Sequence, residues 1–309
     1  MKLVTLILVV LILIMSILVY KLPCSREHLI TDTIIFLSKE NTRDIYKRSN
    51  YIHSFNKYDI KARNLKTSDP VEWYSKRAIN FNKSEMDKLI KAITDIKSKA
   101  RKNPKRWRFL TNLTWKLAKV SDEVDFGFPH THEDTIFLPE NFLEMPLNDL
   151  FIQTLVHEMV HVWQRKMPLE FENLYTNYWD FIKTNRVCGS SDYLEYSRTN
   201  PDLSHMLYIF QGTILPLSIY NKETLDTEYI GIEVEPNNKS DGGYKIKDNV
   251  SPLALNKIQE YSDYFAVTYN HYHPDELSAE LIANLFIKND NYVLPPGSQN
   301  LVKWLDLQN

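Results

Sequence analysis

The chain has 309 residues, of which 43% are hydrophobic and 12% aromatic, enough to bury a sizeable core in one large domain or two small ones. Its 37 basic and 39 acidic residues give a formal net charge of -2 without a long basic stripe, which argues against a nucleic-acid-binding protein. The two cysteines, Cys24 and Cys188, are too few for a disulfide framework and do not report the redox compartment.

The chain opens with an uncharged apolar segment, residues 3–20, which is long enough to span the hydrocarbon core of a bilayer. A cleaved signal peptide is the alternative, but residues 20–23 lack the small side chains that mark a cleavage site. We therefore expect a transmembrane anchor over residues 1–24 and a single-pass membrane protein, or a secreted protein if the segment is cleaved. Basic residues flank the segment on both sides, so the side of the membrane stays open.

Residues 25–80 are polar, with scattered aromatic residues and no strong hydrophobic period. We expect them to form a stem with short helices. The main domain is expected over residues 81–309. It begins with a predicted helix over residues 84–102, with Ser84 as its N-cap, in which apolar residues recur three and four positions apart.

Two strand signals follow this helix. Residues 113–117 alternate apolar and polar side chains, which would place the apolar ones on one face of a sheet. Residues 135–138 are predicted as a short strand, and the prolines nearby suit the edge of a sheet. His130 and His132 precede this strand in a predicted loop, and we expect them to be surface residues.

The next element is a helix predicted over about residues 148–166, which carries the sequence HEMVH. His157 and His161 are four residues apart, so both imidazoles leave the same helix face and can bind one zinc ion. Glu158 is offset by about 100° from His157 and can lie beside the ion. There it can act as general base for a zinc-activated water.

A zinc ion also explains the surroundings of this motif. The neighbouring residues are almost all apolar, and a helix that is apolar on every side is a buried helix. Burying polar groups without a partner is costly, and a dication offsets that cost. The pattern therefore predicts a catalytic site with one Zn²⁺ as its cofactor.

Catalytic zinc generally takes three protein ligands, so a third must come from elsewhere in the chain. The best candidate is Glu276, in a helix predicted over residues 274–287 whose small alanines would let it approach the first helix closely. Glu280, one turn further on, can accept a hydrogen bond from the outer N–H of a zinc-bound histidine. The alternative third ligands are Asp192, Glu170 and Glu172.

The two motifs together resemble the gluzincin zinc metallopeptidases, in which HExxH is joined by a downstream helix carrying Glu-x-x-x-Asp/Glu. The resemblance implies an α+β, zincin-like fold with a mixed sheet packed on the HExxH helix and an edge strand, here residues 135–138, that holds extended peptide. The two motifs are farther apart than in well-known members, which implies a large insertion at about residues 167–265. The matching residues are His157, Glu158, His161, Glu276 and Glu280.

The sequence therefore predicts a membrane-anchored zinc metalloendopeptidase that cleaves polypeptide substrates. Two alternatives stay open: a non-catalytic zincin-fold binding protein, and a zinc hydrolase of a non-peptide substrate. The transition state needs a further hydrogen-bond donor. The candidates just ahead of the second helix are His271, Tyr272 and His273. The sequence predicts no oligomeric state.

Overall fold

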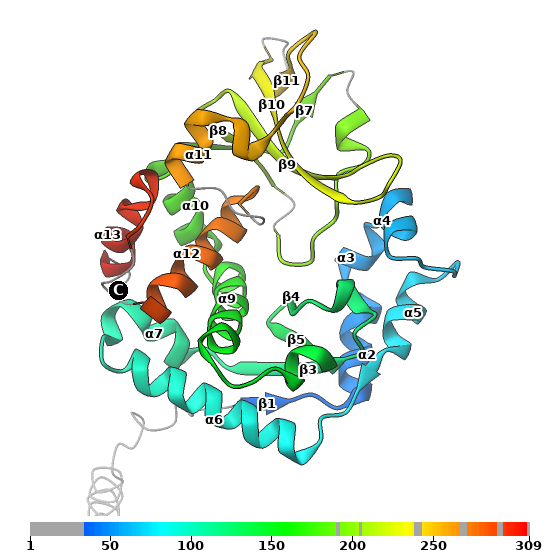
Figure 1. Cartoon of the computed structure of the whole chain (residues 1–309), viewed down its shortest axis with the longest axis vertical. Helices are drawn as coiled ribbons and strands as arrows, with labels where there is room; N and C mark the ends of the chain where they lie inside the picture. The colour runs from blue at the N-terminus through cyan, green and yellow to red at the C-terminus, as the bar shows by residue number, and fades with distance from the viewer. Residues whose placement is uncertain are drawn as a thin grey trace, which may run out of the picture. The chain divides into compact units, whose positions relative to one another are not determined.

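The computed structural model describes most of the chain after residue 33, and these residues form one compact unit (Figure 1). The described residues are 34–189, 192–203, 206–237, 243–265, 271–288 and 293–307. The predicted membrane anchor, within residues 1–24, lies outside them. No helix within the described ranges is both long and apolar enough to cross a bilayer. The predictions of a transmembrane helix and of a single-pass membrane protein are corrected accordingly and are not carried further.

Residues 34–80 were predicted as part of a stem, but they belong to the same compact unit as the rest. β1 (Ile34–Phe36) pairs with the sheet, α2 (Lys39–Arg48) packs against that sheet, and α5 (Pro70–Lys76) packs against α2. The scattered aromatic residues of this region are buried in a shared apolar cluster, which includes Tyr46 and Tyr74. They carry no clear helical period because each short helix contributes only one or two of them.

A five-stranded mixed sheet lies at the centre of the unit, in the order β1-β3-β5-β4 with β2 also paired to β3. β3 (Trp115–Val120) runs parallel to β1 and to β5 (Thr135–Pro139). The strand predicted over residues 113–117 therefore exists but extends to Val120. Its alternation lapses because this part of β3 is buried on both faces.

β4 (His130–His132) runs antiparallel to β5 and forms the end of the sheet. The prediction that residues 135–138 form the edge strand is therefore wrong, because β5 lies between β3 and β4. His130 and His132 are buried rather than on the surface. Three residues are too few to show a strand pattern, so the sequence analysis assigned this strand to a loop.

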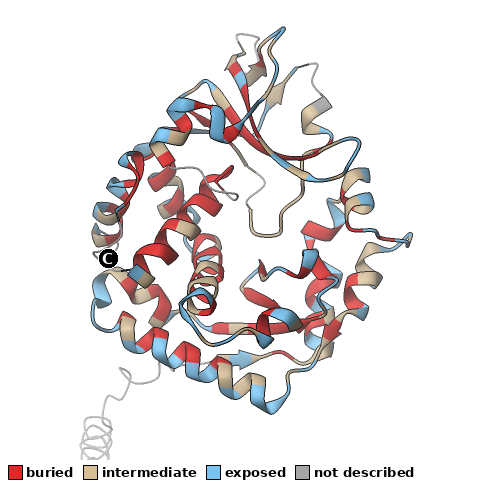
Figure 2. Ribbon diagram, viewed as in Figure 1, coloured by how far each residue is buried: buried red, intermediate tan, exposed pale blue. Residues whose placement is uncertain are grey.

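α9 (Asp149–Lys166) packs on this sheet, and α12 (Pro274–Lys288) packs against α9. Figure 2 shows both helices largely buried. Asn148 caps α9, since its side-chain oxygen accepts a hydrogen bond from the Phe151 amide at 3.0 Å. Ala279 and Ala283 of α12 are fully buried, as expected for closely approaching helices.

The region predicted as an insertion, residues 167–265, contains a second sheet of seven strands, in the order β6-β8-β9-β10-β11-β7 with β12 paired to β10. This sheet has an apolar cluster of its own, which includes Leu215 and Ile232. The segment between β7 and β8 contains residues 198–203, which we call the strap. The strap contacts α9, α12 and β4. The fold is thus α+β with mixed sheets, as predicted.

The remaining helices, turns and strands have the following bounds. The other helices are α3 (Asn50–His53), α4 (Lys57–Ala62), α6 (Lys83–Ala100), α7 (Pro104–Asn112), α8 (Glu140–Glu144), α10 (Pro168–Asn177), α11 (Gln259–Phe265) and α13 (Asn300–Leu307), with 3₁₀ turns η2 (Val124–Gly127), η3 (Asp192–Leu194), η4 (Leu255–Lys257) and η6 (Pro296–Ser298). The other strands are β2 (Ala78–Ile79), β6 (Phe181–Thr184), β7 (Val187–Cys188), β8 (Leu207–Phe210), β9 (Ile214–Tyr220), β10 (Thr227–Pro236), β11 (Tyr244–Ile246) and β12 (Leu253–Ala254). The N-cap of α6 is Asn82 rather than Ser84, because Asn82 and Glu85 form a reciprocal capping box.

Candidate metal centre and cleft

The HExxH motif lies in the middle of α9, on the side that faces α12. The Nε2 atoms of His157 and His161 are 3.0 Å apart, so the two rings converge on one point as the four-residue spacing predicts. His161 is completely buried, while His157 keeps a small exposed surface toward a cavity.

Glu276, in the first turn of α12, completes a group of three converging ligand atoms. Its Oε2 atom lies 3.3 Å from His157 Nε2 and 3.6 Å from His161 Nε2. In a tetrahedral zinc site with bonds of about 2.0–2.1 Å, two ligand atoms are about 3.3–3.4 Å apart. The observed separations of 3.0, 3.3 and 3.6 Å bracket that value, so this donor set fits a zinc ion.

The orientation of the His161 ring is fixed by Gln164, which lies one turn further along α9. Gln164 Nε2 donates to the Asp275 carbonyl at 2.7 Å and to Ser278 Oγ at 2.8 Å. Its Oε1 atom is therefore free to accept from His161 Nδ1, 2.8 Å away. This tautomer leaves the Nε2 lone pair of His161 directed at the cluster, which is the arrangement a metal ligand needs.

Glu280 was predicted to hold a zinc-bound histidine from outside the metal site. Its Oε2 atom is 3.8 Å from His157 Nδ1, which is too long for a hydrogen bond, and its Oε1 atom accepts from Asn284 at 2.9 Å. The structure therefore places Glu280 beside His157 without the predicted hydrogen bond.

The carboxyl and imidazole groups of the cluster shift the pKa values of one another toward the charged forms. Burial opposes ionisation of Glu276, but hydrogen bonds from His157 and His161 outweigh it and lower the pKa of this carboxyl well below its ordinary value. Burial disfavours the charged form of His161, yet the Asp202 and Glu276 carboxylates raise its pKa to about 10. The carboxyl groups of Glu158, Asp202 and Glu276 around two imidazoles form an environment that attracts a cation.

Glu158 lies beside the three ligand atoms and is held from the sheet. Its carboxylate is only 4% exposed, and Oε2 accepts a hydrogen bond from Thr131 Oγ1 at 2.8 Å. Thr131 is the middle residue of β4, so the edge strand positions the predicted general base. This contact was not predicted, because β4 was not recognised as a strand.

A cavity of about 590 Å³ opens over the cluster. His157, Glu158 and Glu276 line one side of it, and Arg198 and Tyr229 line another. Neither of the latter two was singled out from the sequence. Both can donate a hydrogen bond into the cavity, and they come from the region predicted as an insertion.

The three predicted transition-state donors lie elsewhere. His273 faces the Met206 carbonyl, with Nε2 at 3.2 Å, and accepts the Asp275 amide through Nδ1 at 3.1 Å. The Tyr272 hydroxyl oxygen accepts from Asn200 at 2.7 Å. His271 is buried, and burial lowers its pKa to about 4. His271, Tyr272 and His273 are not among the residues that line the cavity.

The alternative third ligands are not part of the cluster. Glu170 and Glu172 lie on α10, and Glu172 forms an ion pair with Lys183 at 2.6 Å. Asp192 begins η3, but its side chain is outside the described part of the structure. Among the described residues, Glu276 is the carboxylate that groups with both motif histidines.

The strap occupies the free edge of β4. The Thr131 amide donates to Asp202 Oδ1 at 2.6 Å, and the Thr131 carbonyl accepts from Arg165 at 3.1 Å. Arg165 also donates to the Pro201 carbonyl at 2.7 Å. Asn200 donates to Glu276 Oε1 at 2.7 Å, so the strap reaches the metal cluster itself.

A second group of potential ligands lies near the first. Asp125, His130 and His132 each offer one ligand atom, and all three atoms lie within 4.8 Å of one another. The sequence analysis missed this group because it treated the two histidines as loop residues. The available signal was their spacing of two, which places both side chains on one face of a strand.

Comparisons of the chain with protein-family models, with curated proteins and with solved structures found no match.

Proposed function

We propose that the protein is a zinc-dependent metallopeptidase of the gluzincin type, which hydrolyses peptide bonds in polypeptide substrates. The observation that carries this proposal is the set of separations among His157, His161 and Glu276, which match those of tetrahedral zinc ligands. A buried carboxylate, Glu158, lies directly beside them. A ligand set with an adjacent base is what hydrolysis by activated water requires.

Zinc bound here would lower the pKa of a water toward 7 and polarise the scissile carbonyl. Glu158 takes the proton of the attacking water and later delivers it to the leaving amine. Thr131 holds the Glu158 carboxylate in place through the 2.8 Å hydrogen bond, so little reorganisation is needed for proton transfer. Arg198 and Tyr229 line the same cavity and supply hydrogen-bond donors for the developing oxyanion.

β4 provides the means of holding an extended peptide. It is the edge strand of the sheet, and the amide and carbonyl of Thr131 point away from β5, the amide toward Asp202 of the strap and the carbonyl toward Arg165 of α9. A substrate strand that paired with these groups would pass directly over Glu158. In the described conformation Asp202 of the strap accepts from the Thr131 amide and Arg165 of α9 donates to the Thr131 carbonyl, so a substrate must displace both side chains.

The test is Glu158→Gln in the full chain, with hydrolysis of a mixture of unstructured peptides followed by mass spectrometry. The amide preserves size and can hydrogen-bond Thr131, but it cannot accept the proton, so we expect a loss of at least about 10²–10⁴-fold in turnover. Zinc content should not change. The matched control is Glu280→Gln, the same chemical change beside the same cavity, which should retain most of the activity.

The outcomes separate this proposal from its alternatives. Wild-type cleavage rates in the Glu158→Gln variant would refute the mechanism. Stoichiometric zinc with peptide binding but without cleavage in the wild type would instead favour a binding protein of the same fold. Hydrolysis of model esters or amides that are not peptides, lost in the same variant, would favour a hydrolase of a different substrate class.

A further inference from the structure

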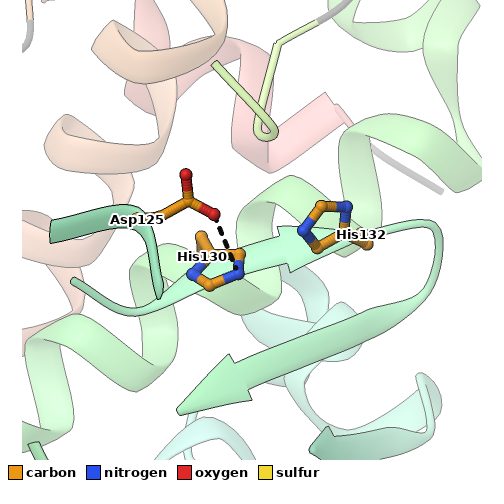
Figure 3. A group of neighbouring side chains, drawn as sticks. All are labelled: Asp125, His130 and His132. Atoms are coloured by element: carbon orange, nitrogen blue, oxygen red, sulfur yellow. Dashed lines mark ion pairs between the residues drawn. The ribbon is translucent and has the colours of Figure 1, made fainter. Parts of the chain in front are cut away.

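On the face of β4 opposite the Thr131 side chain lies a second group of side chains, and two of its members, Asp125 and His130, also line the cavity over the zinc cluster. Thr131 points toward α9, so its two neighbours, His130 and His132, point to the opposite face of the strand. Asp125, from η2, faces them there (Figure 3). All three residues are buried, with 4%, 2% and 3% of Asp125, His130 and His132 exposed.

Each of the three residues keeps one buried polar atom without a hydrogen-bond partner. These atoms are Asp125 Oδ2, His130 Nε2 and His132 Nε2. Figure 3 shows that they face one another. A buried polar atom without a partner costs about 1–3 kcal/mol, so three such atoms in one place call for an explanation.

The other polar atoms of the same side chains are already engaged, which fixes the orientation of each group. His130 Nδ1 donates to the Phe128 carbonyl at 2.9 Å, so Nε2 of the neutral ring carries the lone pair. His132 Nδ1 lies 3.1 Å from Ser49 Oγ. Asp125 Oδ1 accepts from Tyr74 at 3.1 Å.

A proton satisfies this arrangement only in part. A proton on His130 Nε2 would pair that nitrogen with Asp125 Oδ2, 3.4 Å away, but His132 Nε2 would stay without a partner.

We propose that Asp125, His130 and His132 bind a second metal ion, a divalent first-row transition metal such as Zn²⁺. Two imidazole nitrogens and one carboxylate oxygen are typical ligands of zinc, whereas Mg²⁺ and Ca²⁺ prefer oxygen ligands alone. One ion would satisfy all three unpartnered atoms at once. The carbonyl that accepts from His130 Nδ1 is the kind of outer partner that orients metal-bound histidines.

The ion would have a structural role, because it would tie η2 to the edge strand. Asp125 and Phe126 both adopt left-handed backbone conformations, with φ of 44° and 63°, which residues other than glycine rarely occupy. A metal bond to Asp125 would hold this turn in place. It would also restrain β4, whose middle residue Thr131 positions Glu158.

The test counts metal ions in four forms of the full chain by mass spectrometry of metal content, after equilibration with zinc and removal of free ion. We expect two equivalents in the wild type, one in Glu276→Ala, one in His132→Phe, and none in the double variant. Phenylalanine is chosen because its ring can fill the space of the His132 ring between Tyr46 and Phe137. The matched control is His53→Phe, the same change at an exposed histidine outside both groups, and it should keep two equivalents.

A second variant and a second measurement guard against a variant that fails to fold. His130→Phe should also lose one equivalent, since the His130 ring already stacks on Phe137 and a phenyl ring fits there. In the Glu276→Ala background, added zinc should raise the midpoint of thermal unfolding only when both histidines are present. Wild-type metal content in both histidine variants would overturn the second site.

The same experiment separates this site from the proposed catalytic site. If Glu276→Ala kept every equivalent while His132→Phe lost one, the second site would stand and the proposed catalytic ligand set would fail. If the wild type bound one equivalent of zinc and lost it only in Glu276→Ala, the proposed catalytic ligand set would stand and the second site would fail.

Discussion

Gln164 offers a sensitive test of the zinc cluster, because it touches a proposed ligand without being one. Its Oε1 atom accepts from His161 Nδ1 at 2.8 Å, while its Nε2 atom joins α9 to α12 through Asp275 and Ser278. The two ends of one side chain therefore have different roles. The acceptor orients a metal ligand, and the donor holds two helices together.

Two substitutions separate these roles. Gln164→Leu removes both, whereas Gln164→Glu keeps an acceptor for His161 and loses the donor. Loss of the outer partner of a metal-bound histidine typically weakens metal binding about 10–100-fold. We therefore expect that loss in the leucine variant, about 1.4–2.7 kcal/mol at 1.36 kcal/mol per decade, and near wild-type zinc affinity in the glutamate variant.

Stability should follow a different pattern. Both variants lose two hydrogen bonds between α9 and α12, each about 0.5–1.5 kcal/mol, and the leucine also leaves the His161 N–H without a partner. The metal-free unfolding free energy should therefore fall by about 2–4 kcal/mol in Gln164→Leu. Zinc dissociation constants from chelator competition and denaturant unfolding of the metal-free protein measure the two quantities. Equal loss of zinc affinity in both variants, or no loss in either, would refute the reasoning.

Three further predictions concern other contacts of the site. Glu276→Ala should remove zinc from the catalytic cluster and abolish hydrolysis, which metal content and peptide cleavage would measure. Full zinc occupancy in this variant would mean that another residue is the third ligand. Asp202→Ala frees the Thr131 amide from the strap, so the KM for extended peptides should fall, and an unchanged KM would count against substrate pairing with β4. Arg63→Met should destabilise the fold by about 3–5 kcal/mol in denaturant unfolding, because it leaves buried carboxylates unpaired. The control Lys91→Ala breaks an exposed ion pair and should lower the unfolding free energy by under about 0.5 kcal/mol. Equal losses of stability in Arg63→Met and Lys91→Ala would refute the assigned role of burial.

Sequence reasoning predicts well the elements whose hydrophobic pattern repeats over many residues. Between Thr154 and Gln164 the residues of α9 are apolar except at His157, Glu158 and His161, and that contrast is enough to predict a buried site. α12 is predicted for the same reason, and the position of Glu276 in its first turn follows from the spacing. Each inference uses residues close together in the chain.

The parts that were missed depend on contacts between distant residues. β4 has three residues, two of them histidines, so no alternation of apolar and polar side chains reveals it. The strap has no period at all, and its position over the cluster follows from hydrogen bonds to Arg165 and Glu276, far from it in sequence. Arg198 of the strap and Tyr229 of β10 line the cavity although both lie far from the HExxH motif in sequence.

The strap has one consequence for selectivity. The strap belongs to the same chain as β4, so in a peptidase it would compete with every incoming peptide as a tethered ligand. Short flexible tethers give effective concentrations in the millimolar range. A weakly binding segment would lose this competition, and only a chain that makes more contacts along the cleft than the strap does would be cut. Competition from the strap would also let the protein coexist with unfolded polypeptides without degrading them.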